Sequence, residues 1–368
     1  MIFTGGARPN FMKLAPILHV MERLGPEAGA WCLVHTGQHY DPGMSEIFFE
    51  QLGIRSPDVH LGVGSGTHGA QTARVLAAFE ELLLKREPRP RGVVVVGDVN
   101  STMAAALAAV KLLIPVAHVE AGLRSFDRTM PEEINRLVTD AVADLLLVSE
   151  PSGEENLRRE GIDERKVHFV GNVMIDTLVE RLADARGVDA ATELGLPRGG
   201  FALVTLHRPS NVDHADRLER LVEFLGGLAA RLPVVFPAHP RTRARLEEFG
   251  LLERASGLPR LLLREPLGYV QNLSLMADAR LVITDSGGIQ EETSHLGVPC
   301  LTFRENTERP VTVSHGTNTI VGHDLELAAG LVDRILSGEY KQGRPIPRWD
   351  GRAAERVVEV LLDAWGRG

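Results

Sequence analysis

The sequence predicts an α/β protein with two doubly wound domains, in which each parallel sheet is covered by helices on both faces. Short apolar runs alternate with helical patterns along almost the whole chain, as in consecutive β-α-β units. The uninterrupted run Val-Val-Val-Val at residues 93–96 is typical of a strand buried on both faces. At 368 residues the chain is also too long for one ordinary hydrophobic core, which favours two domains.

Charge and cysteine content narrow the class of protein. A net charge of −9 argues against nucleic acid as the main partner, because phosphate backbones bind basic faces. The two cysteines form neither a CxxC motif nor a disulfide framework, which fits a reducing cytoplasm, and without an HExxH motif we expect no metal. The first residues lack a signal-peptide pattern, and no apolar run reaches the roughly 20 residues of a membrane helix. We therefore expect a cytoplasmic protein without membrane partners.

In the first half of the chain, strands and helices follow one another in order. Strands are expected at residues 2–4, 31–34, 93–96 and 116–119, and helices at residues 13–24, 45–51, 69–85 and 100–112. A further helix begins at Pro131, because proline suits the first helical position and glutamates follow in the first turn. Apolar residues at positions 134, 137, 138, 141, 142 and 145 predict that this helix has one buried apolar stripe.

The alternation pauses near residues 167–172 and then restarts. Strands are expected at residues 201–205, 234–236, 260–263 and 281–284. We therefore place the boundary near Gly171, with one domain at residues 1–171, another at residues 172–349, and an amphipathic helix at about 350–368. Ligands of such sheets bind at the carboxyl ends of the strands, so the cleft between the domains is the expected site.

Residues 281–297 combine a strand, a glycine turn and a helix. The turn holds Ser286, Gly287 and Gly288, and glycine lets the backbone approach a ligand closely. The N–H groups at the start of the helix suit a phosphate or pyrophosphate, and Glu292 could reach a ribose hydroxyl. A tightly packed βα turn without a ligand explains the same residues equally well. The loop after the first strand is similar, since two cations, Arg8 and Lys13, follow its glycines; phosphate binding and a solvated surface turn are both open there.

Three carboxylates map to the same end of the first domain. Asp98 directly follows a strand, Glu120 ends the next strand, and Glu132 lies in the first turn of the helix that begins at Pro131. Crowded carboxylates raise one another's pKa and can carry protons, which favours a catalytic role. Helix capping by Asp98 and an ion pair between Glu132 and Arg136 are the structural alternatives.

Histidines and arginines follow strands of the second half. His207 and Arg208 come after one strand, His239 after the next, and Arg309 after the strand expected at residues 301–303. A His-Arg pair at a strand end suits phosphate binding or proton transfer. Hydrogen-bonded loop residues and surface ion pairs are the alternative explanations.

Taken together, the motifs closely resemble those of the non-hydrolysing UDP-N-acetylglucosamine 2-epimerases. The matching segments, in chain order, are Gly6-Ala7-Arg8-Pro9 with Lys13, Thr36-Gly37-Gln38-His39, Gly97-Asp98, His118-Val119-Glu120-Ala121-Gly122-Leu123-Arg124, Pro131-Glu132-Glu133 with Asn135-Arg136, Val170-Gly171-Asn172, His207-Arg208, residues 281–292 and Thr307-Glu308-Arg309-Pro310. The resemblance spans nearly the whole chain, and an ordered set is more specific than any single motif.

The resemblance implies a glycosyltransferase-B fold, in which two Rossmann-like domains face a cleft and the last helix packs back on the first domain. It implies a homodimer that interconverts UDP-N-acetylglucosamine and UDP-N-acetylmannosamine without a metal or redox cofactor, so a UDP-sugar is the expected partner. The proton on C2 of the sugar is not next to a carbonyl. The family therefore eliminates UDP to give 2-acetamidoglucal and adds UDP back with the proton on the other face.

The resemblance also implies roles for single residues. Catalysis is expected from Asp98, Glu120, Glu132 and His207, and UDP-sugar binding from Arg8, Lys13, Arg136, Ser286, Gly287, Gly288, Glu292 and Arg309. Many bacterial members are activated by a second UDP-N-acetylglucosamine, for which Gln38, Arg208 and His239 are the matching residues here.

The sequence also departs from the family pattern. The first loop reads Gly-Ala-Arg-Pro-Asn where the family usually has Gly-Thr-Arg-Pro-Glu, and residues 36–69 and 126–128 resemble a sister branch that acts on UDP-2,3-diacetamido-glucuronate. Arg309-Pro310 instead favours the N-acetylglucosamine branch, because the sister branch tends to lose this pair. A glycosyltransferase of the same fold and a non-catalytic sugar-nucleotide sensor are further alternatives, but neither explains the three acids.

Overall fold

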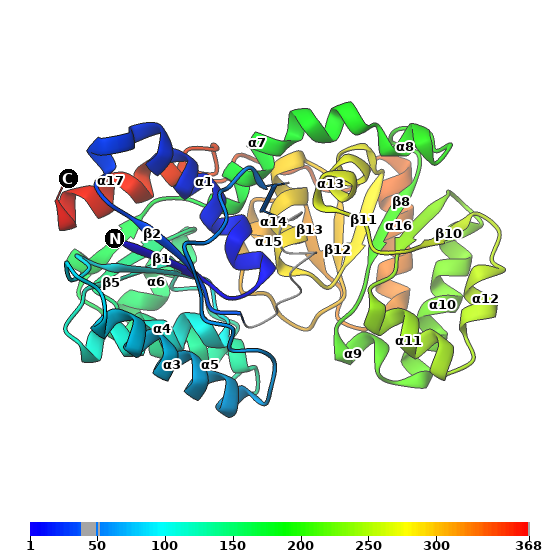
Figure 1. Ribbon diagram of the computed structural model, residues 1–368. Coiled ribbons are helices and arrows are strands. Elements are labelled where there is room, and N and C mark those ends of the chain that lie inside the picture. Colours follow the sequence, from blue (N-terminus) through cyan, green and yellow to red (C-terminus); the bar gives the residue numbers. More distant parts are fainter. Residues whose placement is uncertain (38–48, 51, 367–368) are drawn as a thin grey trace. The chain divides into compact units, whose positions relative to one another are not determined.

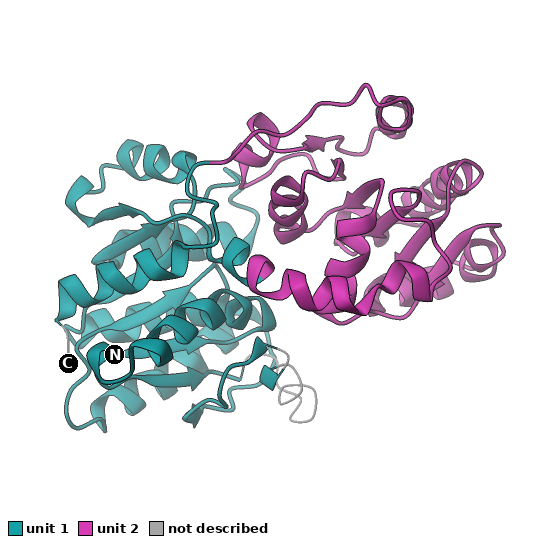
Figure 2. Cartoon of the chain, turned by 90° about the horizontal axis from the view of Figure 1, so that it is seen from above, with its two compact units in different colours: residues 1–177, 347–368 teal, residues 178–346 magenta. Residues whose placement is uncertain are grey.

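The computed structural model describes residues 1–37, 49–50 and 52–366, which form two compact units (Figure 1). Unit 1 contains Met1–Thr177 and Pro347–Gly368, and unit 2 contains Leu178–Ile346 (Figure 2). The sequence placed the division near Gly171, whereas the structure divides the chain after Thr177, within helix α7 (Val173–Val188). The helix expected at residues 45–51 lies largely outside the described residues.

Unit 1 is built on a seven-stranded sheet in the order β3-β2-β1-β4-β5-β6-β7, in which every pairing is parallel. Its strands are β1 (Ile2–Gly5), β2 (Cys32–His35), β3 (Val59–His60), β4 (Val93–Val96), β5 (Val116–Ala121), β6 (Leu145–Val148) and β7 (Val167–Phe169). Its helices are α1 (Arg8–Leu24), α3 (His68–Leu84), α4 (Asn100–Lys111), α5 (Pro131–Val142), α6 (Pro151–Arg159) and α17 (Ala353–Trp365), with short 3-10 turns η1 (Gly25–Ala28) and η2 (Glu164–Lys166).

The all-valine strand β4 shows how this sheet is covered. Val94 and Val96 pack into the core beneath α1 and α17, whereas Val93 and Val95 pack into the core beneath α3 and α4. Successive side chains of a strand point to opposite faces, so an uninterrupted apolar run is what a sheet covered on both sides requires. The helices lie on the two sides of the sheet accordingly (Figure 1).

Unit 2 repeats this plan with a six-stranded parallel sheet in the order β10-β9-β8-β11-β12-β13. Its strands are β8 (Ala202–Thr205), β9 (Val234–Pro237), β10 (Leu261–Arg264), β11 (Leu281–Thr284), β12 (Cys300–Thr302) and β13 (Asn318–Ile320). Its further helices are α8 (Ala190–Glu193), α9 (Pro209–Val212), α10 (Ala215–Ala229), α11 (Pro240–Glu248), α12 (Leu252–Ser256), α13 (Tyr269–Asp278), α14 (Gly287–Leu296), α15 (Pro310–Ser314) and α16 (Leu325–Ser337). Among the described residues, no helix combines the length and apolar character needed to cross a bilayer.

Strand order decides where each unit can bind a ligand. In unit 1 the chain direction across the sheet reverses between β1 and β4, and in unit 2 it reverses between β8 and β11. Loops on either side of such a reversal diverge, which leaves a crevice at the carboxyl ends of the strands. The loops that carry the residues singled out by sequence follow these four strands and their neighbours β5, β9 and β12.

Candidate active site

The unit 1 site consists of the loops that follow β1, β4 and β5 together with the first two turns of α5. The loop after β1 is tightly enclosed, because a Cβ added to Gly6 would lie 2.1 Å from Ser101 Oγ and 2.6 Å from Thr36 Oγ1. Asn10 Oδ1 accepts hydrogen bonds from the N–H groups of Gly6 and Ala7 at 3.1 and 3.0 Å. This fixes the start of α1, where Arg8 is exposed to solvent.

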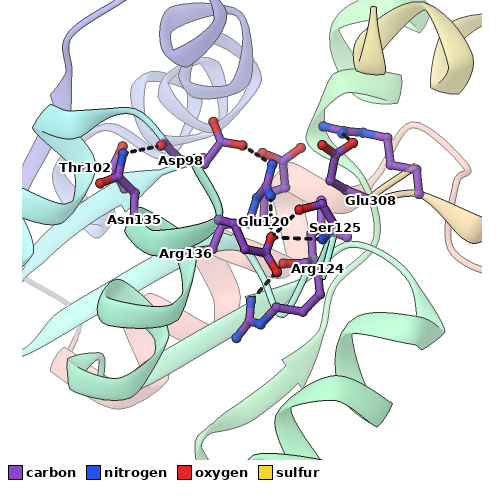
Figure 3. Close-up of polar contacts among 12 residues, drawn as sticks. Asp98, Thr102, Glu120, Arg124, Ser125, Asn135, Arg136 and Glu308 are labelled. Carbon is purple, nitrogen blue, oxygen red and sulfur yellow. Dashed lines mark hydrogen bonds and ion pairs between the residues drawn. The ribbon is translucent and has the colours of Figure 1, made fainter. Parts of the chain in front are cut away.

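Asp98 is held by helix α5 from two directions. Arg136 Nη2 donates to Asp98 Oδ2 at 2.6 Å, and Asn135 Nδ2 donates to the carbonyl oxygen of Asp98 at 2.8 Å (Figure 3). The Asp98 side chain keeps 22% of its surface exposed, whereas that of Arg136 keeps 4%. The carboxylate is therefore oriented by a buried cation while it remains accessible.

Glu120 and Lys13 form a second ion pair, in which the two side chains are 4% and 8% exposed. Glu120 has a φ of 71°, a conformation that costs a residue with a side chain about 1–3 kcal/mol. The register between β5 and β6 also shifts at this residue. On the preceding strand Gly97 leaves room for the pair, because a Cβ there would lie 2.9 Å from Lys13 Nζ. The backbone is thus bent to present the Glu120 carboxylate to Lys13.

The buried face of α5 is polar, so the prediction of a buried apolar stripe is wrong. Its buried residues are Glu133, Asn135, Arg136, Thr139 and Asp140, whereas the apolar residues Ile134, Leu137, Val138 and Val142 are half-buried and Ala141 is exposed. The helix faces the polar loops at the strand ends, and a polar face there satisfies their hydrogen-bonding groups.

Glu133, rather than Glu132, forms the ion pair with Arg136. Arg136 Nη1 donates to Glu133 Oε2 at 2.8 Å, whereas the structural alternative drawn from the sequence paired Arg136 with Glu132. The same Glu133 carboxylate accepts from the N–H and hydroxyl of Ser125 at 2.9 Å and from the N–H of Phe126 at 3.0 Å (Figure 3). Glu132 itself is partly exposed in the first turn of α5.

The unit 2 site consists of the loops that follow β8, β9, β11 and β12 together with the start of α14. A Cβ added to Gly287 would lie 2.7 Å from Arg309 Nη1, so the Arg309 guanidinium lies directly against the first residue of this helix. Arg309 Nε donates to Glu291 Oε1 at 2.5 Å, which fixes its position. Ser286 and Gly288 lie at the same helix start. A guanidinium beside the N–H groups of a helix start is suited to bind a phosphate.

A buried ion pair between Arg304 and Glu308 lies next to the Arg309 guanidinium. Arg304 donates two hydrogen bonds to Glu308, at 2.8 and 2.7 Å, and both side chains are less than 5% exposed. Glu308 Oε2 lies 3.6 Å from Arg309 Nη1. Glu308 lies in the Thr307–Pro310 motif, but pairing between buried side chains leaves no local pattern from which this role could be predicted.

Asp285, a residue not predicted to have a role, organises the loop that carries His207. Its Oδ2 accepts from the N–H groups of His207 and Arg208 at 2.9 and 2.8 Å and from Asn211 Nδ2 at 2.9 Å. Its Oδ1 lies 2.9 Å from His207 Nδ1. Burial acts to raise the pKa of Asp285, but the ring of His207, the Arg208 N–H and the Asn211 amide outweigh it and keep the pKa below its ordinary value. The position of Asp285 directly after a strand, like that of Asp98, was the available signal.

Two histidines from neighbouring loops meet in the unit 2 site. The rings of His207 and His239 lie 5.2 Å apart between centroids, and the side chain of His207 is 40% exposed. Burial, followed by the nearby His207 and Arg241, lowers the pKa of His239. Arg208 follows His207 in the same loop, where its N–H donates to Asp285. Gln38, the third residue expected at a second UDP-sugar site, lies outside the described residues.

Glu292 is buried, and among the residues that the structure describes no cation forms an ion pair with it. Tyr269 Oη donates to Glu292 Oε1 at 2.9 Å. Burial raises the pKa of Glu292 to about 7, a nearby Glu291 adds to this, and the tyrosine hydrogen bond opposes it. This acid therefore differs from Asp98 and Glu120, each of which contacts a cation.

Neither site has the donor set of a metal centre. Within the part of the chain that the structure describes, no group of three or more His, Cys, Asp or Glu side chains is placed to hold a metal ion. What the two sites offer is ion-paired carboxylates in unit 1 and a glycine-rich helix start with a guanidinium in unit 2.

Comparison with known proteins connects this arrangement to one family. The profile described as UDP-N-acetylglucosamine 2-epimerase matches residues 26–362. The UDP-N-acetylglucosamine 2-epimerase of Methanocaldococcus jannaschii is 42% identical over 97% of both chains. The UDP-2,3-diacetamido-2,3-dideoxy-D-glucuronate 2-epimerase of Pseudomonas aeruginosa is 43% identical, again over 97% of both chains.

Solved structures agree with the sequence comparisons. The crystal structure of the M. jannaschii UDP-GlcNAc 2-epimerase in complex with UDP-GlcNAc and UDP matches with a TM-score of 0.87, covering 98% of this chain and 99% of that one. The UDP-GlcNAc 2-epimerase of Neisseria meningitidis bound to UDP-GlcNAc matches with the same TM-score at 28% identity, with the same coverage. Two parallel sheets flanked by helices form a fold of the glycosyltransferase-B type, which confirms the predicted fold class. Profile, relatives and fold agree, and the chain belongs to the UDP-N-acetylglucosamine 2-epimerase family.

Proposed function

We propose that this protein interconverts UDP-N-acetylglucosamine and UDP-N-acetylmannosamine by eliminating UDP and adding it back. The observation that carries the proposal is the pair of carboxylates at the unit 1 strand ends, Asp98 on Arg136 and Glu120 on Lys13. Inverting C2 requires a base for one face of the sugar and an acid for the other, and a single carboxylate cannot serve both faces.

The proposed reaction is balanced without a cofactor. One carboxylate removes the proton from C2, a C1–C2 double bond forms, and the C1–oxygen bond breaks, so that its electrons leave with UDP. The product is 2-acetamidoglucal. In the return step UDP adds to C1 while a second acid delivers a proton to the opposite face of C2. Asp98, Glu120 and Glu132 are the proposed proton carriers.

Unit 2 is proposed to stabilise the departing UDP. Arg309 and the start of α14, with Ser286, Gly287 and Gly288, would bind the diphosphate, and Glu292 would bind the ribose. With Nδ1 of His207 held by Asp285, Nε2 is the ring nitrogen that would act on the diphosphate. The relatives crystallised with UDP-GlcNAc and UDP support a UDP-sugar as the ligand. In unit 1, Arg8, Lys13 and Arg136 are the proposed contacts.

UDP-2,3-diacetamido-glucuronate is a second candidate substrate. The P. aeruginosa relative that is named for this sugar is 43% identical, against 42% for the M. jannaschii relative. Identity therefore does not separate the two sugars. Arg309-Pro310 favours N-acetylglucosamine, since it is the pair that the sister branch tends to lose.

Nuclear magnetic resonance in heavy water tests the proposal. The protein is incubated with each UDP-sugar, and we expect UDP-N-acetylglucosamine to give the manno epimer with deuterium at C2. A faster reaction of the diacetamido-glucuronate would assign the chain to the second substrate. If neither sugar gives an epimer or exchanges its C2 proton, the proposed function is wrong.

Activation by a second UDP-N-acetylglucosamine is proposed to involve Gln38, Arg208 and His239. Two observations support a defined site here: the N–H of Arg208 is held by Asp285, and the ring of His239 lies close to that of His207, which precedes Arg208. Initial rates measured against substrate concentration should then be sigmoidal in the wild type and hyperbolic in His239→Ala. A hyperbolic wild-type curve would exclude the activation.

A further inference from the structure

A fully buried carboxylate on α5 contacts the chain on both sides of Glu120. Asp140 is 1% exposed and lies one turn after Arg136 on the same helix. Its Oδ1 lies 2.6 Å from Nδ1 of His118, two residues before Glu120. Its Oδ2 accepts from the N–H of Gly122, two residues after Glu120, at 3.0 Å.

His118 extends this contact to the neighbouring loop. Its Nε2 donates to the carbonyl oxygen of Gly97 at 2.8 Å, and a carbonyl can only accept, so this nitrogen carries a proton. Gly97 directly precedes Asp98, and His118 is completely buried. One carboxylate is thereby connected to the loops that carry both ion-paired acids.

The charge of Asp140 is matched within the same cluster. Arg124 Nη1 lies 2.7 Å from Asp140 Oδ2, and its other nitrogens bind Glu160 in a bidentate pair at 2.7 Å. Burial acts to raise the pKa of Asp140, but His118 and Arg124 together hold the pKa below its ordinary value. Asp140 is therefore a carboxylate, which accepts all of these hydrogen bonds.

The position of the cluster coincides with the strained part of the backbone. Glu120 has a φ of 71°, Gly122 has a φ of 81°, and the β5–β6 register shifts between Val119 and Ala121. A strained segment persists only where its surroundings hold it in place. A Cβ on Gly122 would lie 2.5 Å from the carbonyl oxygen of Gly153, so the chain is also confined from the other side.

We propose that Asp140 is a positioning residue for the epimerisation. It holds the segment that carries Glu120 through its contacts to His118 and Gly122, and it holds the Gly97–Asp98 turn through His118. The inference rests on the proposed function and adds to it a group that does not touch the substrate. A purely structural ion cluster would affect stability alone, whereas a positioning group affects the chemical step more than ligand binding. The two roles are therefore separable by experiment.

The test compares Asp140→Ala and Asp140→Asn with Asp176→Asn in the full chain. Asp176 is a matched control, because it is also buried and accepts from two backbone N–H groups, those of Ala353 and Ala354, at the start of α17. For each variant we measure kcat and KM by nuclear magnetic resonance, UDP affinity by calorimetry, and the melting temperature.

We expect kcat of Asp140→Ala to fall about 100-fold, because a displacement of roughly 1 Å at a reacting group costs this much. Asparagine keeps the shape of the side chain and one hydrogen-bond acceptor. The kcat of Asp140→Asn should therefore fall only about tenfold, less than that of Asp140→Ala. UDP affinity should stay within about twofold in both, and Asp176→Asn should lose stability but keep kcat within about twofold.

Two results would overturn the inference alone. In the first, Asp140→Asn has the same kcat as Asp176→Asn at temperatures well below both melting points. In the second, the kcat of Asp140→Asn falls only in proportion to its UDP affinity. The asparagine variant decides even if Asp140→Ala does not fold.

A third result would overturn the proposed function as well. If the wild type itself produces no epimer, the proposed function fails, and the inference fails with it.

Discussion

Both sites lie at the carboxyl ends of parallel strands, but they present side chains of opposite charge. In unit 1 the strand ends carry the acids Asp98 and Glu120, and the basic residues Arg136 and Lys13 hold those acids in place. In unit 2 the cation Arg309 faces the start of α14, and acids hold the cation. A parallel sheet fixes where a ligand binds, while the residues that follow each strand decide which ligand.

The glycines of the two sites also differ in backbone conformation. Gly97 and Gly122 of unit 1 have φ values of 65° and 81°, a region that favours glycine. Gly287 of unit 2 has no such φ, and its missing side chain instead makes room for Arg309. At Gly97 and Gly122 a positive φ and close approach both require glycine, whereas at Gly287 close approach alone requires it. From this comparison we expect unit 1 variants to lose chemistry and unit 2 variants to lose UDP.

Removing either acid of unit 1 should have the largest effect. Asp98→Asn and Glu120→Gln should each lower kcat roughly 1,000-fold, because a positioned proton carrier contributes about 100- to 10,000-fold. Calorimetry should find UDP affinity within about threefold of the wild type, since the residues proposed to bind the diphosphate and the ribose, Arg309 and Glu292, lie in unit 2. Asp144→Asn is the control, because Asp144 binds the N–H of Val116 at the start of β5. Full activity in either acid variant would contradict the comparison.

Arg309→Ala should reverse this pattern. Loss of a charge-assisted contact to the diphosphate costs up to about 3 kcal/mol, so UDP should bind about 100-fold more weakly. Arg254→Ala removes an exposed arginine that pairs with Glu219 and Glu223 in the same unit, and it should leave UDP affinity unchanged. If the two variants bind UDP with equal affinity, the proposal that Arg309 binds UDP is wrong.

Glu292→Gln should change how stability depends on pH, because burial raises the pKa of Glu292. The pKa of Glu292 is raised from 4.5 to about 7, so between these pH values the unfolded chain has lost the proton and the folded chain keeps it. Stability therefore falls as pH rises through this window, and the penalty is complete above it. Compared with the wild type, Glu292→Gln should gain roughly 2 kcal/mol between pH 5 and 8.

Thermal unfolding at several pH values measures this difference. Tyr269→Phe should increase the pH dependence, because the tyrosine hydrogen bond lowers the pKa of Glu292. A stability difference between Glu292→Gln and the wild type that does not change with pH would contradict the assignment.

The smallest effect is expected at the helix start of unit 2. In Gly287→Ala the new methyl group lies 2.7 Å from Arg309 Nη1, so the guanidinium must shift. We expect UDP to bind about fivefold more weakly, a modest part of the roughly 100-fold assigned to Arg309. Gly330→Ala in α16 meets nothing within 4 Å, and it should leave UDP affinity unchanged while stabilising the helix slightly. If Gly287→Ala binds UDP as tightly as the wild type, the proposal that Arg309 and the start of α14 bind the diphosphate together is wrong.

The sequence could predict the strands and the position of the acids, because periodicity and strand ends are local properties. The run at residues 93–96 and the acids Asp98 and Glu120 are examples. Periodicity shows which residues of a helix share a face, but not which face is buried. The prediction for α5 failed for this reason, because its polar face, with Glu133, packs against the loops.

Contacts between distant residues were beyond a sequence argument. Asp285 binds a loop 78 residues away in the sequence, and Asp140 binds His118 across 22 residues. Neither pair has a spacing that marks it, since the strand order that brings them together is a property of the whole sheet. Tyr269, which binds Glu292 across 23 residues, was missed for the same reason.

The central claim, that UDP leaves the sugar and returns, is tested most directly with oxygen-18 in the bond between C1 and the β-phosphate. The wild type is incubated with labelled UDP-N-acetylglucosamine, and the recovered substrate is analysed by phosphorus magnetic resonance. If UDP is released and re-added, the β-phosphate can rotate in between, and the label should spread to the non-bridging oxygens. Epimer formation with all of the label still in the bridge would contradict the account.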